Sequence, residues 1–300
     1  MRVLITGSSG LLGRRLRHRL EQRGDEVWTL DRRAQGGHSL AWLGNSAELE
    51  AQLPAGLDAV VHLAGSPIAV WPWTAAARAR ILESRTIPTC QLAEALAWRA
   101  ARTGERPRLL SGSAVGLYRP GWPAVDETDP GAAASFLGQV CREWEAAALP
   151  AREAGLPLLW LRTGLVLDPA GGLLGRLLPL FRRGLGARLG AADLPWSWIH
   201  AEDWVEAVVW LLTAELTGPV NLCAPQPARQ QEALGWLAER TGHRLLPGPP
   251  DWLVGLAGGR MARELLLESP AVHPARLLEG GFRFKHPQLH AALQDLVGPG

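Results

Sequence analysis

The sequence RVLITGSSGLLG at residues 2–13 is the most informative stretch of this 300-residue chain. It begins with an apolar run rich in β-branched residues, Val3 to Thr6, which is typical of a buried parallel strand. Three glycines follow, at Gly7, Gly10 and Gly13, and then leucines recur on one face of a helical pattern. A strand, a glycine-rich turn and a helix in this order predict a loop that holds the pyrophosphate of a dinucleotide.

Each glycine of this loop has a conformational or packing role that a larger residue could not fill. Gly7 permits a tight turn out of the strand, and Gly10 lets the backbone approach a phosphate without a Cβ in the way. Gly13 lets the helix pack closely on the strand, while the free N–H groups at the helix start face the phosphates. An ordinary tight turn is the alternative interpretation. The Gly-x-x-Gly-x-x-Gly spacing resembles that of extended and atypical short-chain dehydrogenase/reductases, since the other common spacing needs a glycine where Leu11 stands.

Composition indicates a globular protein with one large domain, or a main domain with a smaller appendage. The chain is 47% hydrophobic and 20% charged, and its net charge of +2 comes without a basic stripe, so we expect no nucleic-acid partner. No apolar run approaches the ~18 residues that a membrane helix needs, and the first strand begins too early for a signal peptide. Three widely spaced cysteines suggest neither a disulfide framework nor a metal site. We therefore expect a cytoplasmic protein without a membrane partner.

Strand and helix signals alternate through the first half of the chain, which predicts right-handed βαβ units and a parallel sheet. Past residue 164 the pattern loosens into glycine-rich turns, and a proline-rich stretch at 247–252 precedes short helical patterns. We predict an α/β fold, a doubly wound parallel sheet (Rossmann) with a smaller C-terminal substrate-side lobe. The predicted domains are an NAD(P)-binding domain at 1–245, with lobe elements from about 165, and a small C-terminal domain at 246–300.

The individual elements can be predicted with approximate ends. Beyond the first strand, the expected strands cover residues 26–31, 39–43, 58–63, 108–111, 156–162, 197–199 and 220–223. The longer expected helices cover residues 74–101, 135–154 and 202–212.

The end of the second strand carries two opposing signals about the dinucleotide. Asp31 follows the glycines by about 20 residues, and an acid there accepts hydrogen bonds from the adenosine ribose and favours NAD. The adjacent Arg32 and Arg33 either pair with a 2′-phosphate, which favours NADP, or form a solvated turn. The sequence therefore predicts NADP or NAD and leaves the choice open.

Several further motifs occur in a characteristic order. HLAGSPI (62–68) follows the fourth strand, SGSAVGLY (111–118) follows the fifth, and LRTGLVL covers residues 161–167. WSWIHAEDW spans residues 196–204, and ARLLEGGFRFKHPQLHAAL lies near the end of the chain. Together these motifs resemble the bacterial epimerase-family proteins of the atypical short-chain dehydrogenase/reductases, which have a small C-terminal domain.

The resemblance implies where a small-molecule substrate and a cofactor bind. Ser113 would hydrogen-bond the reacting hydroxyl or carbonyl, and its alternative role is to cap the turn at the strand end. Tyr118 is either a proton donor or an amphipathic residue of the pocket wall. Arg162 ends the sixth strand, where it either contacts substrate or cofactor or forms a buried ion pair. The resemblance also implies a homodimer through the two long helices that flank the fifth strand. The residues implied to contact the cofactor are Gly7, Ser9, Gly10, Leu11, Leu12, Gly13, Asp31, Arg32, Leu63, Ala64, Gly65 and Arg162.

The chain departs from the usual enzymes of this kind at their catalytic pair. Those enzymes carry Tyr-x-x-x-Lys on the helix after the fifth strand, where lysine lowers the pKa of the tyrosine and holds the ribose. Here the single tyrosine is Tyr118 and the single lysine is Lys285. Two registers of the expected helix give the equivalent positions: Phe136 and Val140, or Leu137 and Cys141. Neither register offers a base.

The remaining candidates have structural alternatives. His200 either takes part in catalysis or caps the next helix, and His62, inside an apolar strand, is expected to be a hydrogen-bonded core histidine. The acidic loop at 126–129 is expected to be solvated surface. Three tryptophans either line a stacking pocket or pack in the core: Trp71, Trp73 and Trp198.

We predict an NAD(P)-binding, epimerase/dehydratase-like oxidoreductase that acts on a small hydroxyl or carbonyl compound, for example a nucleotide sugar. The missing base favours the reductive direction, in which only an acid is required. The alternative is a non-catalytic NADP(H)-binding sensor or regulatory protein, which the loss of the catalytic pair also supports.

Overall fold

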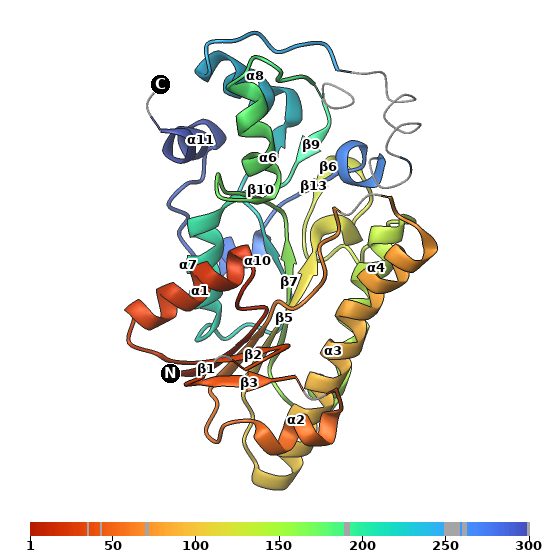
Figure 1. The fold of residues 1–300 in the computed structure, drawn as a ribbon, viewed down its shortest axis with the longest axis vertical. Helices are drawn as coiled ribbons and strands as arrows, with labels where there is room; N and C mark the ends of the chain where they lie inside the picture. Colours follow the sequence, from red (N-terminus) through yellow and green to blue (C-terminus); the bar gives the residue numbers. More distant parts are fainter. Residues whose placement is uncertain are drawn as a thin grey trace.

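A computed structural model describes residues 1–34, 36–42, 44–69, 72–188, 193–248, 259 and 263–298. A seven-stranded sheet lies at its centre, with the strand order β11-β7-β5-β4-β1-β2-β3 and every neighbouring pair parallel (Figure 1). Chain progression reverses between β1 and β4, so the predicted doubly wound parallel sheet is confirmed. The strands of this sheet are β1 (Arg2–Thr6), β2 (Glu26–Asp31), β3 (Ser39–Ala41), β4 (Ala59–His62), β5 (Arg108–Ala114), β7 (Leu158–Thr163) and β11 (Gly218–Leu222).

Helices cover both faces of the sheet because successive side chains of each buried strand point to opposite faces. Val3 and Ile5 of β1 pack with Leu16 and Leu20 in one core, whereas Leu4 belongs to the core of the other face. The first face is covered by α1 (Leu11–Gln22), α7 (Ala201–Leu211) and α10 (Ala275–Glu279). The second is covered by α2 (Ser46–Gln52), α3 (Ala75–Thr103), α4 (Phe136–Ala147) and α5 (Leu149–Glu153).

Two element ends differ from the sequence prediction for local reasons. The helix expected at 135–154 is two helices, α4 and α5, because Pro150 occupies the first turn of α5 and has no N–H to continue α4. β5 continues to Ala114, three residues past its predicted end, because it pairs with β7 as far as Thr163. β3 ends at Ala41, and Leu43 of its predicted range lies outside the described residues.

A smaller lobe lies above the carboxyl ends of the sheet strands (Figure 1). Its apolar core joins side chains from three helices, including Phe181 of α6, Leu237 of α8 and Leu293 of α11, and it contains the fully buried Trp198. The lobe is consistent with the predicted C-terminal elements, while the boundary at 245/246 stays a prediction. Its elements are α6 (Gly172–Phe181), α8 (Gln230–Arg240) and α11 (Leu289–Val297), with the paired strands β8 (Leu165–Leu167) and β10 (Trp198–His200), and β9 (Pro195–Trp196) and β12 (Ala228–Arg229).

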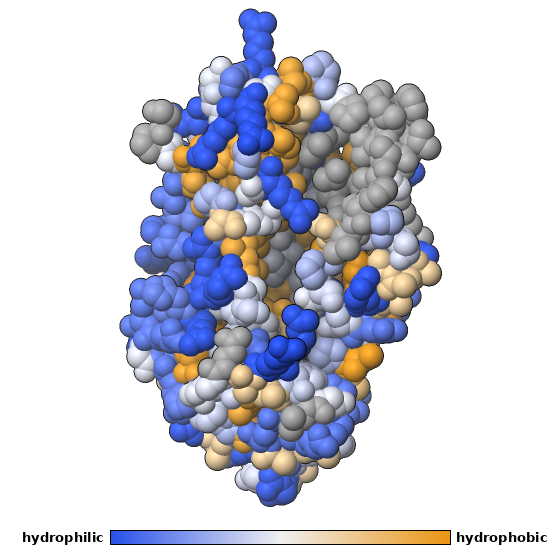
Figure 2. Space-filling model, viewed as in Figure 1, coloured by the Kyte–Doolittle hydropathy of each residue, from blue (hydrophilic) through white to orange (hydrophobic). Residues whose placement is uncertain are grey.

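Short elements connect this lobe to the sheet. β6 (Gly121–Val125) pairs with β13 (Pro270–Val272), while η1 (Val115–Leu117) leads into β6 and η2 (Arg263–Leu267) precedes β13. Figure 2 shows a largely hydrophilic face with a furrow down its middle, between the side of α1 and α7 and the side of α3 and α4. None of the helices in the described part of the chain combines the length and apolarity needed to cross a bilayer.

Candidate functional site

The glycine loop lies at the carboxyl end of β1, next to the strand-order reversal. Gly7 has a φ of +71°, and a Cβ there would lie 2.8 Å from the carbonyl carbon of Leu63. A Cβ at Gly13 would collide with the Gly7 carbonyl oxygen, to which the Gly10 N–H donates at 3.0 Å. Gly10 precedes α1 without any side-chain cap, so the first N–H groups of the helix remain available to an anion. The geometry fits a pyrophosphate, and contacts to the backbone of Ser9, Leu11 and Leu12 stay a prediction.

A buried hydrogen-bond network holds the end of β4 against β1. Thr6 Oγ1 accepts the N–H groups of Leu63 and Ala64, each at 3.2 Å, and lies 2.7 Å from His62 Nδ1. The other ring nitrogen of His62 lies 2.9 Å from Thr89 Oγ1. Burial lowers the pKa of His62 to about 4, so the ring is neutral. The prediction of a hydrogen-bonded core histidine is confirmed.

The predicted adenosine end lies beside a polar cavity. Asp31, at the end of β2, accepts a hydrogen bond from Ser8 Oγ at 2.7 Å, and the adjacent Arg32 is exposed. The cavity measures about 670 Å³ and lies between α1 and the segment that joins β2 to β3. Its lining includes Ser8, Ser9, Arg14, Arg17, His18, Glu21, Val27, Thr29, Asp31, Gly36, Gly37, His38 and Ser39.

Ser113, near the end of β5, begins a chain of side-chain hydrogen bonds. Its Oγ donates to Glu145 Oε1 at 2.7 Å, and Arg162 donates to both oxygens of Glu145, at 2.8 and 2.9 Å. Arg162 Nη1 also donates to the Tyr118 hydroxyl at 2.8 Å, and that hydroxyl donates to Asn221 Oδ1 at 2.8 Å. The structure thus links Ser113 to Tyr118 through an ion pair, and Arg162 forms the buried ion pair that was one of its two alternatives.

Tyr118 is unsuited to act as a base. Only 1% of it is exposed, and burial raises its pKa to about 12 against the opposing effect of Arg162. For Arg162, burial alone would lower the pKa, but the hydrogen bonds and charge of Glu145 outweigh it and raise the pKa. Tyr118 is therefore a neutral phenol that accepts from a permanent cation, and its hydroxyl is buried between Arg162 of β7 and Asn221 of β11.

The helix after β5 carries no base at the positions of the usual catalytic pair. Phe136 and Val140 pack in a small apolar cluster with Ile81 of α3. Cys141 is buried near the backbone of Ala114, and burial raises the pKa of its thiol to about 12. The functional group that α4 does contribute is Glu145, one turn beyond Cys141, and a search confined to the Tyr-x-x-x-Lys pattern misses it.

Arg85 is a second residue that the sequence interpretation missed. It lies on the inner side of α3, where Nη2 donates to the Ser66 carbonyl at 2.9 Å and the guanidinium stacks over Trp144 at 5.2 Å. A Cβ at Gly65 would lie 3.1 Å from Cζ of Arg85, so the predicted cofactor-lining loop after β4 rests directly on this side chain. The signal in the sequence was an arginine within the apolar face of the helix, a position that Arg99 shares.

His200 has a capping role. Its Nδ1 accepts the N–H of Glu202 at 3.1 Å at the start of α7, and its ring stacks on His286 at 3.8 Å. His200, Glu202 and His286 place potential ligand atoms within 4.8 Å of one another. Because Nδ1 accepts a backbone N–H, the neutral ring carries its hydrogen on Nε2 and has no lone pair left for a cation. The arrangement fits the capping alternative better than a metal centre.

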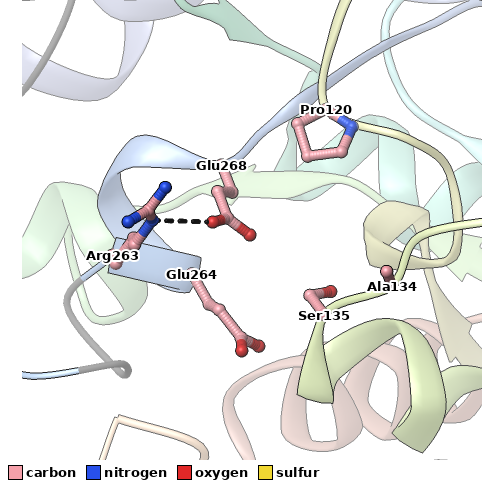
Figure 3. Close-up of a pocket in the computed structure, with 6 residues that line it drawn as sticks. All are labelled: Pro120, Ala134, Ser135, Arg263, Glu264 and Glu268. Atoms are coloured by element: carbon pink, nitrogen blue, oxygen red, sulfur yellow. Dashed lines mark hydrogen bonds and ion pairs between the residues drawn. The ribbon is translucent and has the colours of Figure 1, made fainter.

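A cavity of about 530 Å³ lies at the N-terminal end of α4, facing the C-terminal segment (Figure 3). Glu264 of η2 reaches the start of the helix, where its carboxylate accepts the N–H groups of Phe136 at 3.1 Å and Leu137 at 2.9 Å. Arg263 and Glu268 form an ion pair at 3.1 Å on the other wall. The remaining lining residues are Pro120, Ala134 and Ser135. Cavities between two structural units are common places for a substrate.

The remaining candidates from the sequence have structural roles wherever they fall within the described residues. Glu127 is buried and accepts the Asn221 N–H at 2.8 Å, so the prediction of solvated surface is wrong for this residue. Trp198 packs in the lobe core, and Trp73 packs edge-on against Phe136. Trp71 lies outside the described residues.

Comparison with known proteins identifies two matching family models and several similar proteins. The model of the NAD dependent epimerase/dehydratase family matches residues 3–223, and that of a domain of unknown function (DUF1731) matches residues 249–296. The chain is 38% identical over 296 residues to the epimerase family protein Mb2239 of Mycobacterium bovis, covering 97% of this chain and 96% of that protein. It is 33% identical over 301 residues to the epimerase family protein SDR39U1 of Homo sapiens, covering 99% and 100%.

Solved structures of related proteins share the fold of this chain. A crystal structure of human SDR39U1 (isoform 2) with NADPH has a TM-score of 0.87 at 31% identity, covering 99% of both chains. The UDP-glucose 4-epimerase of Thermus thermophilus in complex with NAD shares the fold, with a TM-score of 0.73 at 23% identity, covering 99% of both chains. The predicted family and its nicotinamide dinucleotide cofactor are confirmed at the level of the family. This chain belongs to the NAD dependent epimerase/dehydratase family.

Proposed function

We propose that the protein is an NADP(H)-dependent oxidoreductase that reduces the carbonyl of a small molecule. The observation that carries the proposal is the uncapped glycine loop at β1 together with a hydrogen-bonding serine, Ser113, near the end of β5, two strands away. The pyrophosphate would lie on the loop from Gly7 to Gly13, and Leu63, Ala64 and Gly65 would line the cofactor beyond β4. The dinucleotide would supply the hydride, and the chain would bind and orient both reactants.

Ser113 would hold the reacting oxygen of the substrate. Its hydroxyl donates to Glu145, but Glu145 keeps two hydrogen bonds from Arg162 if Ser113 turns its hydrogen toward a substrate carbonyl. Such a turn exchanges one hydrogen bond for another, which differ by about 1 kcal/mol or less in their net contribution. Ser113 is therefore free to stabilise charge that develops on the oxygen. Tyr118 would act as a positioning residue that holds Arg162, rather than as the proton donor.

The charges around the adenosine end favour NADPH. Arg14 and His18 line the cavity beside Asp31, and Arg14 Nη1 donates to the Ser9 carbonyl at 2.5 Å. Arg32 is exposed next to Asp31 and unpaired among the described residues. The two arginines offset the repulsion that Asp31 would exert on a 2′-phosphate. The human relative, crystallised with NADPH, supports the same choice.

Consumption of NADPH with a panel of small aldehydes, ketones and nucleotide sugars tests the proposal. We expect turnover with at least one carbonyl compound, and we expect Ser113→Ala to lower kcat 100-fold or more while NADPH affinity changes less than twofold. Tight binding of NADPH without turnover on any compound would favour the alternative, a sensor or regulatory protein, for which the missing catalytic pair is the supporting feature.

A further inference from the structure

Arg85 is a buried cation without an acidic partner in the described part of the chain. It is 9% exposed, and its hydrogen bonds go to neutral oxygens: Nη1 to the Ile81 carbonyl and Nη2 to the Ser66 carbonyl, both at 2.9 Å. Arg99, which lies on the same helix and is 6% exposed, instead pairs with Glu105 at 2.7 Å. The two buried arginines of this helix therefore differ in the presence of an anion.

A buried charge without a counter-charge destabilises a protein unless something bound there compensates for it. Burial lowers the pKa of the Arg85 guanidinium, and the nearby Cys141 thiol is the one group that opposes this effect. That thiol is itself neutral, because burial raises its pKa to about 12. Among the described residues, the charge of Arg85 is thus met by carbonyl oxygens and the Trp144 ring but by no carboxylate, which leaves the guanidinium able to bind an anionic or strongly polar ligand.

The sheet order indicates which ligand atoms lie nearby. The pyrophosphate loop follows β1, and Asp31, at the adenosine end, follows β2. The nicotinamide half of a dinucleotide must then extend in the other direction, over β4 and β5. Arg85 lies on that side, between the Gly65 loop after β4 and Trp144 of α4.

Arg85 also lies near the position of the missing lysine. In the register that begins at Leu137, Cys141 stands where the usual Tyr-x-x-x-Lys helix has its lysine. The alternative residue, Val140, packs toward Ile81 in an apolar cluster, whereas Cys141 is close to the end of β5 and interacts with Arg85. A cation from α3 therefore occupies the region in which α4 lacks one.

We propose that Arg85 binds the ribose-phosphate group that carries the nicotinamide, and thereby replaces the binding role of the absent lysine. The inference rests on the proposed dinucleotide binding and deepens it. It covers binding alone: the single tyrosine, Tyr118, has its hydroxyl on Arg162 and Asn221, so Arg85 has no tyrosine to activate.

Calorimetric titration of the full chain with three ligands tests the inference. NADPH and 2′-phospho-ADP-ribose both contain the second ribose phosphate, whereas adenosine 2′,5′-bisphosphate lacks it. We expect Arg85→Gln to weaken the first two at least tenfold, about 1.4 kcal/mol, and the third by less than twofold. Arg85→Lys, which keeps the charge, should recover part of the lost affinity.

Arg99→Gln is the matched control. It removes one partner of a partly buried ion pair, so its Tm should fall while its affinity for all three ligands stays within twofold of the wild type. Arg85→Gln removes a charge without a carboxylate partner together with two hydrogen bonds to carbonyl oxygens, so its Tm should fall less than that of Arg99→Gln. Loss of affinity with a smaller loss of stability than in the control identifies a ligand-binding residue.

Three results separate the possible failures. Unchanged NADPH affinity in Arg85→Gln would overturn the inference and leave the proposed function standing. An equal loss for all three ligands would also overturn it, since the effect would not be specific to the nicotinamide side. Wild-type protein that binds neither NADPH nor NADH would contradict the proposed function itself.

Discussion

At the scale of single residues, the buried polar chain from Ser113 to Asn221 replaces the usual catalytic pair with a fixed ion pair. Glu145 accepts from both Ser113 and Arg162, and Arg162 in turn holds the hydroxyl of Tyr118. Each member hydrogen-bonds to the next, so the network orients Ser113.

Tyr118 gives a direct test of this network, because it is the single tyrosine of the chain and its ionisation can be followed by absorbance. Its pKa is raised to about 12 in the folded protein, from an ordinary value of 10.0. The folded state therefore favours the protonated phenol, so the stabilisation is fully present below pH 10 and is lost as the pH rises toward 12. We expect a loss of about 2–3 kcal/mol over that window.

The measurement is a tyrosinate titration at 295 nm in native and denatured protein, with urea unfolding at each pH. Tyr118→Phe should lack the decline in stability between pH 10 and 12. A native titration midpoint near 10 would show that Tyr118 is accessible to solvent and would contradict the buried network.

At the scale of elements, two close contacts at glycines and one histidine hold β1, β4, α1 and α3 together. Gly7 and Gly13 allow α1 to start directly against the β4 loop, and His62 links β4 to Thr6 of β1 and Thr89 of α3. The same close approach that packs these elements leaves the N–H groups of α1 open at the strand ends.

Gly10→Leu should abolish NADPH binding without unfolding the protein. A Cβ at this position meets no atom nearer than the Gly7 carbonyl oxygen, at 3.2 Å, so the fold tolerates the change better than the phosphate site does. We expect affinity to fall at least 100-fold and Tm to change by a few degrees, measured by calorimetry and thermal melting. Gly235→Ala, in α8 with no atom within 4 Å, is the control and should change neither. Retained affinity in Gly10→Leu would refute the pyrophosphate loop.

His62 makes the β1–β4–α3 junction sensitive to acid. Its pKa is lowered to about 4, from 6.5, so the fold favours the neutral ring. Stability that is present above pH 6.5 is therefore lost as the pH falls toward 4. In His62→Gln, the free energy of unfolding, measured by chemical unfolding from pH 7 to pH 4, should depend less on pH. An unchanged pH dependence would assign the acid sensitivity to other groups.

At the scale of the whole molecule, the sheet and its first-face helices follow from local patterns, whereas the site depends on distant pairings. The glycine spacing, the alternation of strands and helices and the buried position of His62 were all predictable, because each is set by neighbouring residues. The burial of Glu127 was not, because it depends on Asn221 and Arg276, which lie far along the chain. Likewise, Glu145 and Arg85 look like ordinary helical charges until the fold brings them beside Arg162 and Gly65.

The outer side of α3 provides a test of assembly. Ile87 is 52% exposed and Trp98 is 49% exposed, and these two large apolar side chains are three helical turns apart on this helix, which flanks β5 together with α4. We expect a homodimer through α3 and α4, which a double change of Ile87 and Trp98 to Glu should convert to monomer in sedimentation equilibrium. Leu180→Glu, an exposed leucine in α6, is the control and should leave the dimer intact. A monomeric wild type would contradict this expectation.

We propose that the strand ends around the glycine loop bind a phosphorylated nicotinamide dinucleotide. The most direct test of this proposal is calorimetric titration of cofactor-stripped protein with NADPH and NADH in parallel. We predict binding of both, with NADPH at least tenfold tighter, which corresponds to about 1.4 kcal/mol. Preference for NADH would show that Asp31 outweighs the arginines and would overturn the choice of NADP(H), and binding of neither would contradict a dinucleotide site at the glycine loop.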